Sequence, residues 1–144
     1  MIHFVGAGPG AADLITMRGH QLLTQADVII YAGSLVNPEL LQYAKESCSI
    51  YNSASKTLEE VIDVMKQAEE KNQLTVRLHT GDPCLYGAIR EQMDQLDAYN
   101  ITYDVVPGVS SFCGAAAALK AEYTLPNVSQ SVIITRMAGR TPVP

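Results

Sequence analysis

An acidic side chain next to a glycine and a proline follows an apolar run near the middle of the chain. The run Leu74 to Leu78 is typical of a buried strand, and Thr80-Gly81-Asp82-Pro83 comes soon after it. A strand that ends in this way puts one carboxylate and nearly bare backbone at the carboxyl edge of a sheet, where open α/β sheets bind their ligands. Asp82 is therefore a candidate ligand contact, and the alternative is that it caps the start of the next helix.

A glycine-rich loop follows the first apolar segment. Ile2 to Val5 predicts a strand, and Gly6-Ala7-Gly8-Pro9-Gly10 comes after it. Gly6, Gly8 and Ala11 fit the Gly-x-Gly-x-x-Gly/Ala dinucleotide fingerprint. Two features count against nucleotide binding. Pro9 removes a backbone donor that would hold a pyrophosphate, and no acid follows the second expected strand, Val28 to Tyr31, where a ribose-binding residue would stand.

A third turn has the same position relative to its strand. Ile101 to Val106 predicts a strand, and Pro107-Gly108-Val109-Ser110-Ser111 follows it, before an alanine-rich helix over 112–120. Ser110 and Ser111 are ordinary N-cap candidates for that helix. Like Asp82, they also lie just past the carboxyl end of a strand.

Strands and helices alternate along the chain, and this alternation indicates how the turns are positioned. Helices are expected over about 14–25, after Asn37-Pro38, from the capping box of Thr57 and Glu60, and over 88–96, with further strands over 49–51 and 131–135. The predicted fold class is α/β, with three layers and a mostly parallel five-stranded sheet. Right-handed crossovers would bring the glycine-containing turns to one edge of the sheet.

The composition excludes several classes of function. A length of 144 residues is enough for one domain, and 47% hydrophobic with 17% charged residues indicates an ordered globule. A formal charge of -5 without a basic cluster argues against a nucleic-acid partner. No apolar run approaches the roughly 20 residues of a membrane span, so we expect no membrane partner and a cytoplasmic location. Three scattered cysteines suggest neither a disulfide framework nor a metal site.

Three motifs, in this order and spacing, resemble those of the tetrapyrrole methylase family. They are Val5-Gly-Ala-Gly-Pro-Gly10 with Leu14-Ile-Thr-Met-Arg-Gly19 after it, Thr80-Gly-Asp-Pro-Cys-Leu-Tyr-Gly87, and Val106-Pro-Gly-Val-Ser-Ser111. The segments that most resemble the precorrin-4 C11-methyltransferases of cobalamin synthesis are 31–36, 77–82 and 139–144. The resemblance implies a C-methyltransferase that uses S-adenosylmethionine, leaves S-adenosylhomocysteine, and acts on cobalt-precorrin-4 or metal-free precorrin-4, with the cobalt-containing substrate as first choice.

The family resemblance also implies a domain organisation. Its members have two α/β domains, with the methyl donor bound between them. Residues 1–125 would be the N-terminal domain, and residues 126–144 the linker and the first strand of a truncated C-terminal domain. This chain alone would then be inactive, because half of the donor site is missing. The resemblance further implies a homodimer.

The resemblance assigns two sets of residues. Those implied to contact the donor are Pro9, Thr80, Gly81, Asp82, Leu85, Ser110, Ser111 and Ala115. Those implied to line the tetrapyrrole site are Gly8, Gly10, Asp13 and Arg18. The catalytic residue is unknown, and Asp13 and His79 are candidates for a general base.

Three alternatives stay open. The first is methylation of another position on the corrin ring. The second is a non-catalytic binding fragment. The third is a dinucleotide-binding oxidoreductase, which would require an acid after the second strand.

Overall fold

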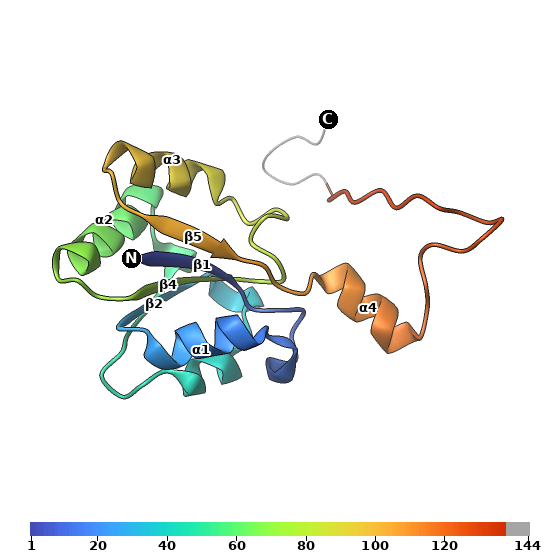
Figure 1. Ribbon diagram of the computed structural model, residues 1–144, viewed down its shortest axis with the longest axis horizontal. Coiled ribbons are helices and arrows are strands. Elements are labelled where there is room, and N and C mark those ends of the chain that lie inside the picture. Colours follow the sequence, from blue (N-terminus) through green and yellow to red (C-terminus); the bar gives the residue numbers. More distant parts are fainter. Residues whose placement is uncertain (138–144) are drawn as a thin grey trace. The chain divides into compact units, whose positions relative to one another are not determined.

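The computed structural model describes residues 1–137 and, for Ser34, only the backbone (Figure 1). Its strands are β1 (Ile2–Gly6), β2 (Val28–Tyr31), β3 (Ser49–Asn52), β4 (Thr75–His79) and β5 (Tyr103–Val106). Its α-helices are α1 (Met17–Gln25), α2 (Leu58–Glu70), α3 (Arg90–Ala98) and α4 (Ser111–Leu119). The short 3-10 helices are η1 (Ala12–Leu14), η2 (Gly33–Leu35), η3 (Pro38–Tyr43) and η4 (Ser53–Ser55).

The five strands form one parallel sheet in the order β3-β2-β4-β1-β5. β4 is central, and its Thr75 and His79 pair in register with Ile2 and Gly6 of β1. Because all strands run in the same direction, their carboxyl ends meet at one edge, as the sequence predicts. The α/β fold class with a five-stranded sheet is confirmed.

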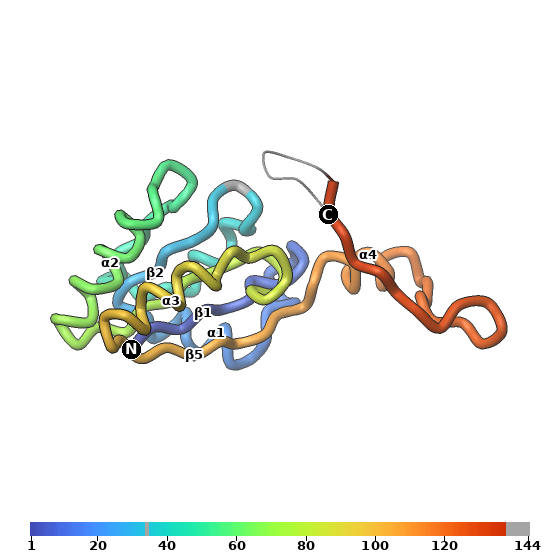
Figure 2. Tube along the Cα trace, turned by 90° about the horizontal axis from the view of Figure 1, so that it is seen from above, coloured from blue at the N-terminus to red at the C-terminus, as the bar shows by residue number. Residues whose placement is uncertain are grey.

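Helices cover both faces of the sheet, which gives the three predicted layers (Figure 1). On one face, α2 and α3 lie side by side over apolar side chains such as Phe4 and Ile30 (Figure 2). On the other face, α1 and η3 pack on Val5, Ile29 and Leu78. Successive residues of a strand point to opposite faces, so each strand contributes to both cores.

Local signals explain where the helices begin. Thr57 caps α2 through the predicted capping box, with its hydroxyl accepting from the Glu60 N–H. The helix expected from about residue 14 is divided, because the glycine-rich loop continues through η1 and Thr16 caps α1 only at Met17. The helix expected over 88–96 begins later, at Arg90.

The chain divides into two compact units, Met1–Gly114 and a second from Ala115 onward. In the second unit, the strand expected over 131–135 is wrong for the described residues: they have no regular structure, and Ile133 is 90% exposed. A strand needs a hydrogen-bonded neighbour, and the strand-like pairing of this unit, among the described residues, is limited to an isolated bridge between Leu125 and Ser129. The segment 139–144 lies outside the described residues.

Candidate functional site

The glycine-rich loop after β1 is bonded directly to the turn after β4. The Gly8 N–H donates to the Gly81 carbonyl at 3.2 Å, and the Gly81 N–H donates back to the Gly8 carbonyl at 2.9 Å. Both glycines have positive φ angles, 80° and 59°, which other residues rarely adopt. The reciprocal pair therefore holds the two turns together at the carboxyl edge of the sheet.

The turn after β5 packs against the same pair of turns. A Cβ placed on Gly108 would lie 2.1 Å from the Gly81 carbonyl oxygen and 2.8 Å from the Gly6 Cα. Real Cβ atoms essentially never come so close to backbone atoms. Three strand ends thus meet through their backbones, at a contact that only glycine permits.

The Asp82 carboxylate links two of these turns. One oxygen accepts from the Cys84 N–H at 2.8 Å, and the other accepts from the Gly108 N–H at 2.9 Å. No helix starts beside Asp82, since α3 begins only at Arg90. The helix-cap alternative is therefore wrong, and Asp82 instead fixes its own turn and joins it to the turn after β5.

Two further residues expected at the donor have contacts with these turns of the first unit. Gly81 lies against Ser110, since a Cβ added there would be 3.5 Å from the Ser110 Cα. Pro9 packs on Gly114, at the end of the first unit. The remaining positions are half-buried Thr80, Leu85 with 39% exposure, exposed Ser111, and exposed Ala115, which is the first residue of the second unit.

Hydrogen bonding within the first loop leaves it unsuited to a pyrophosphate. The Gly8 N–H donates to Gly81, the Ala7 N–H donates to the His79 carbonyl at 2.7 Å, and Pro9 has no N–H. A phosphate cradle requires backbone N–H groups aimed at the ligand. No acidic residue stands at the end of β2, where Tyr31 is followed by Ala32 and Gly33. The arrangement disfavours a dinucleotide.

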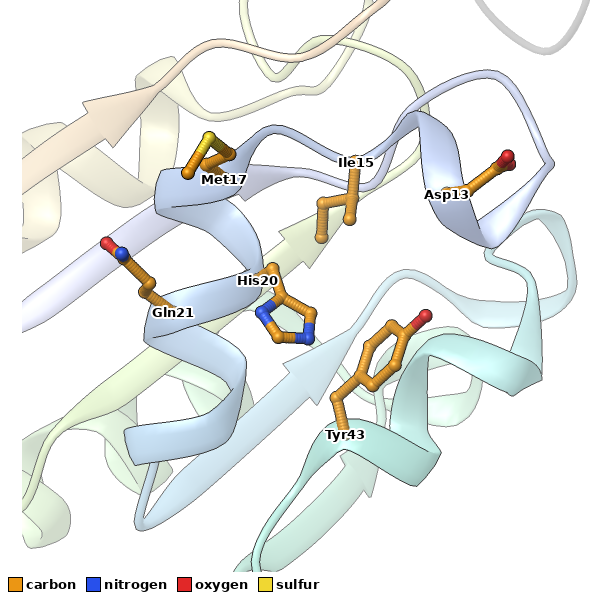
Figure 3. A pocket seen from close by; sticks show the side chains of 6 residues that line it. All are labelled: Asp13, Ile15, Met17, His20, Gln21 and Tyr43. Carbon is orange, nitrogen blue, oxygen red and sulfur yellow. The ribbon is translucent and has the colours of Figure 1, made fainter.

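Two of the residues expected at the tetrapyrrole belong to η1 and α1, which follow the first loop. Asp13 belongs to a pocket of about 250 Å³, in which His20 of α1 faces Tyr43 of η3 with ring centres 4.5 Å apart (Figure 3). Arg18 is exposed on α1. Gly10 is closer to the first loop, where its carbonyl accepts from the Asn37 side-chain amide at 2.8 Å.

His79 does not have the surroundings of a general base. Its side chain is only 3% exposed, and its ring lies 6.1 Å from that of Phe4 in the apolar layer under α2 and α3. Burial, together with the charge of Arg77, lowers the pKa of His79 to about 3. The imidazole is thus neutral near pH 7 and enclosed by protein.

The buried imidazole predicts a pH dependence of stability. The folded-state pKa lies below the unfolded value of 6.5, so stability is complete above pH 6.5 and falls as the pH drops toward 3, because the unfolded chain takes up a proton that the folded chain resists. We expect a loss of about 2 kcal/mol in unfolding free energy between pH 7.5 and pH 5. In His79→Leu, the unfolding free energy from denaturant titration should change less with pH between pH 7.5 and pH 5. The same pH dependence as in the wild type would show that His79 is not its source.

Sequence reasoning missed a polar row inside the sheet. Thr75, Arg77 and His79 alternate along β4 and face α2 and α3, in register with Ile2, Phe4 and Gly6. All three side chains are buried. The signal was present as polar residues at every second position of an apolar run, which is the period of a strand.

Comparison with known proteins agrees with the geometry. Residues 1–143 match the profile of the tetrapyrrole (corrin/porphyrin) methylases. The chain is 59% identical to a cobalt-precorrin-4 C(11)-methyltransferase of Methanocaldococcus jannaschii over 97% of this chain and 54% of that protein. The chain thus spans about half the length of that relative.

Solved structures give the same result. The X-ray structure of a cobalt precorrin-4 methyltransferase of cobalamin biosynthesis matches with a TM-score of 0.95 and 47% identity, over 99% of this chain and 60% of that one. A uroporphyrin-III C-methyl transferase from Thermus thermophilus, complexed with S-adenosyl homocysteine, matches with a TM-score of 0.68 and 29% identity, over 80% of this chain and 47% of that one. The chain belongs to the tetrapyrrole (corrin/porphyrin) methylases.

Proposed function

We propose that this chain is part of an S-adenosylmethionine-dependent C-methyltransferase of cobalamin synthesis, acting on C11 of cobalt-precorrin-4 or precorrin-4. The names of two similar proteins support the cobalt-containing substrate as first choice. The observation that carries the proposal is the junction of Gly8, Gly81 and Gly108, which forms a small-residue edge beside one carboxylate and has no phosphate cradle. Such an edge suits a cationic ligand better than an anionic one.

The chemistry requires little of the protein beyond alignment. S-adenosylmethionine, when bound, supplies a methyl group already activated on a sulfonium, and the leaving thioether is neutral. The residues of the three turns would orient the donor so that methyl, sulfur and the attacking ring carbon lie in line. Fixing two reactants in this way can contribute on the order of 7 to 11 kcal/mol relative to free encounter. Asp82 would add a negative charge near the sulfonium.

The residue roles follow from the same proposal. We assign to the donor Pro9, Thr80, Gly81, Asp82, Leu85, Ser110, Ser111 and Ala115, and to the tetrapyrrole Gly8, Gly10, Asp13 and Arg18. We further propose that residues 1–125 form the N-terminal domain and that residues 126–144 are the linker and the start of the next one, where 131–135 would form a strand only beside a neighbour from that domain. We also propose that the protein is a homodimer and is located in the cytoplasm. Among residues 1–137, no helix is long and apolar enough to cross a membrane.

Calorimetric titration tests the donor assignment. The protein as encoded, with any sequence beyond residue 144, should bind S-adenosylhomocysteine with a dissociation constant between roughly 1 µM and 1 mM, the usual range for enzyme substrates. Titration with NADH is the matched control and should give no saturable signal. Binding heat with NADH but none with S-adenosylhomocysteine would contradict the methyltransferase assignment and favour an oxidoreductase.

A further inference from the structure

A buried arginine lies in β4, the strand that precedes the turn carrying Asp82. Arg77 is in the centre of β4 and only 6% exposed. None of the ion pairs among the described residues includes it. Burial lowers the pKa of Arg77 to about 10, so the guanidinium is still charged near pH 7. A buried cation without a carboxylate is unfavourable unless hydrogen bonds hold it, and its partners show what it does.

Arg77 is bonded to the sheet on one side and to α3 on the other. Its Nη1 donates to the Ile30 carbonyl of β2 at 3.2 Å, and its Nε donates to the Gln92 Oε1 at 3.0 Å. Gln92 lies in the first turn of α3 and is itself buried. The guanidinium therefore connects the central strands to the start of that helix.

Gln92 passes the connection to the loop between β4 and α3. While its Oε1 accepts from Arg77, its Nε2 donates to the Ala88 carbonyl at 3.1 Å. Because both ends of the amide are engaged, its orientation is fixed by the two partners. Arg77, Gln92 and Ala88 thus form a continuous chain of hydrogen bonds from the sheet to the end of the loop.

The end of that loop has a conformation that needs support. Tyr86 and Ala88 have positive φ angles of 57° and 51°, which cost residues with a Cβ of order 1 kcal/mol or more each. Between them, Gly87 packs so closely on Pro83 that a Cβ would lie 2.1 Å from the Pro83 carbonyl oxygen. Loop 83–88 is therefore tightly packed on itself, so a bond that fixes the position of Ala88 also restrains the turn at Asp82.

We propose that Arg77 and Gln92 are positioning residues for the donor site, which hold loop 83–88 in the conformation that presents Asp82 and Leu85. They reach the donor only through this loop. The inference rests on the proposed function for the identity of the ligand, but the loop conformation can be measured without any ligand.

Gln92→Glu separates the two halves of the connection. A glutamate at this position still accepts from Arg77, now as an ion pair, but it has no N–H for the Ala88 carbonyl and sets two acceptors against each other. In the protein as encoded, we expect about tenfold weaker binding of S-adenosylhomocysteine by calorimetry. The amides of Cys84 and Leu85 should exchange hydrogen about tenfold faster without ligand. The melting temperature should not fall.

Matched variants keep this test decisive. Gln95→Glu makes the same change at an exposed position of the same helix and should alter neither affinity nor exchange. Arg77→Lys keeps the charge but loses the planar fork of the guanidinium. It should therefore weaken affinity and speed exchange, as Gln92→Glu does, and it serves as the second variant if Gln92→Glu folds poorly.

Two results would overturn the inference. One is Gln92→Glu with unchanged affinity and unchanged exchange at Cys84 and Leu85. The other is a fall in the melting temperature of Gln92→Glu with faster hydrogen exchange throughout the sheet. That result would show that Arg77 and Gln92 stabilise the fold as a whole and do not position the loop. If the unaltered protein fails to bind S-adenosylhomocysteine, the proposed function fails, while the exchange comparison still decides the positioning role.

Discussion

Gly108→Ala should destabilise the protein by about 3 kcal/mol or more. The added methyl would overlap the Gly81 carbonyl oxygen, 2.1 Å away, and the Gly6 Cα, 2.8 Å away. These are backbone atoms at the ends of β4 and β1, so relief requires the central strands of the sheet to move. Urea unfolding followed by circular dichroism measures the loss directly, provided that the slope of the transition is unchanged.

Gly19→Ala is the matched control for that substitution. Gly19 is also buried, but an added Cβ would meet side-chain atoms of Val5 and Ile15 at 3.0 and 3.1 Å, which can shift by a few tenths of an ångström. Alanine also favours the helix by about 1 kcal/mol over glycine. The net change should therefore stay below about 1 kcal/mol. Equal destabilisation by the two variants would show that the backbone contact at Gly108 has no special importance.

The sequence predicts the first unit well because its signals are local. β1 and β2 are short, mostly apolar runs, and α2 begins at the capping box of Thr57 and Glu60. Gathering of the turns on one edge follows from parallel strands and right-handed crossovers alone. The strand expected over 131–135 fails because a strand depends on a distant partner, which an apolar run does not supply.

The site is predictable in its residues but not in its contacts. The motifs identify Gly8, Asp82 and Ser110 as neighbours on one edge, and the structure brings the three turns together. That Asp82 bonds Gly108 across 26 positions cannot be read from a helix-cap pattern, which describes local bonds only. The bond between Arg77 and Gln92 could not be predicted either, because secondary-structure propensity gives no reason to bury a cation against a glutamine.

Asp82→Ala should weaken binding of S-adenosylhomocysteine about a hundredfold and destabilise the fold by about 3 kcal/mol. The substitution removes the acceptors for two backbone N–H groups, at Cys84 and Gly108, each held by a charged oxygen at 2.8 to 2.9 Å. Hydrogen bonds to a charged group contribute about 1.5 to 3 kcal/mol each. Losing both releases the turn after β5 from the turn after β4. Calorimetry on the protein as encoded measures the affinity, and thermal unfolding measures the stability.

Two further variants divide this effect into shape and charge. Asp82→Asn keeps one acceptor and must turn its amide N–H groups toward one of the two donors, so its losses should lie between those of wild type and Asp82→Ala. Asp94→Ala removes an exposed acid that pairs with Arg90 on the surface of α3, and it should change stability by no more than about 0.5 kcal/mol. An Asp82→Ala protein with wild-type affinity would remove this carboxylate from the donor site. Loss of affinity in Asp82→Asn with full stability would instead indicate that the charge of Asp82 acts on the bound ligand directly.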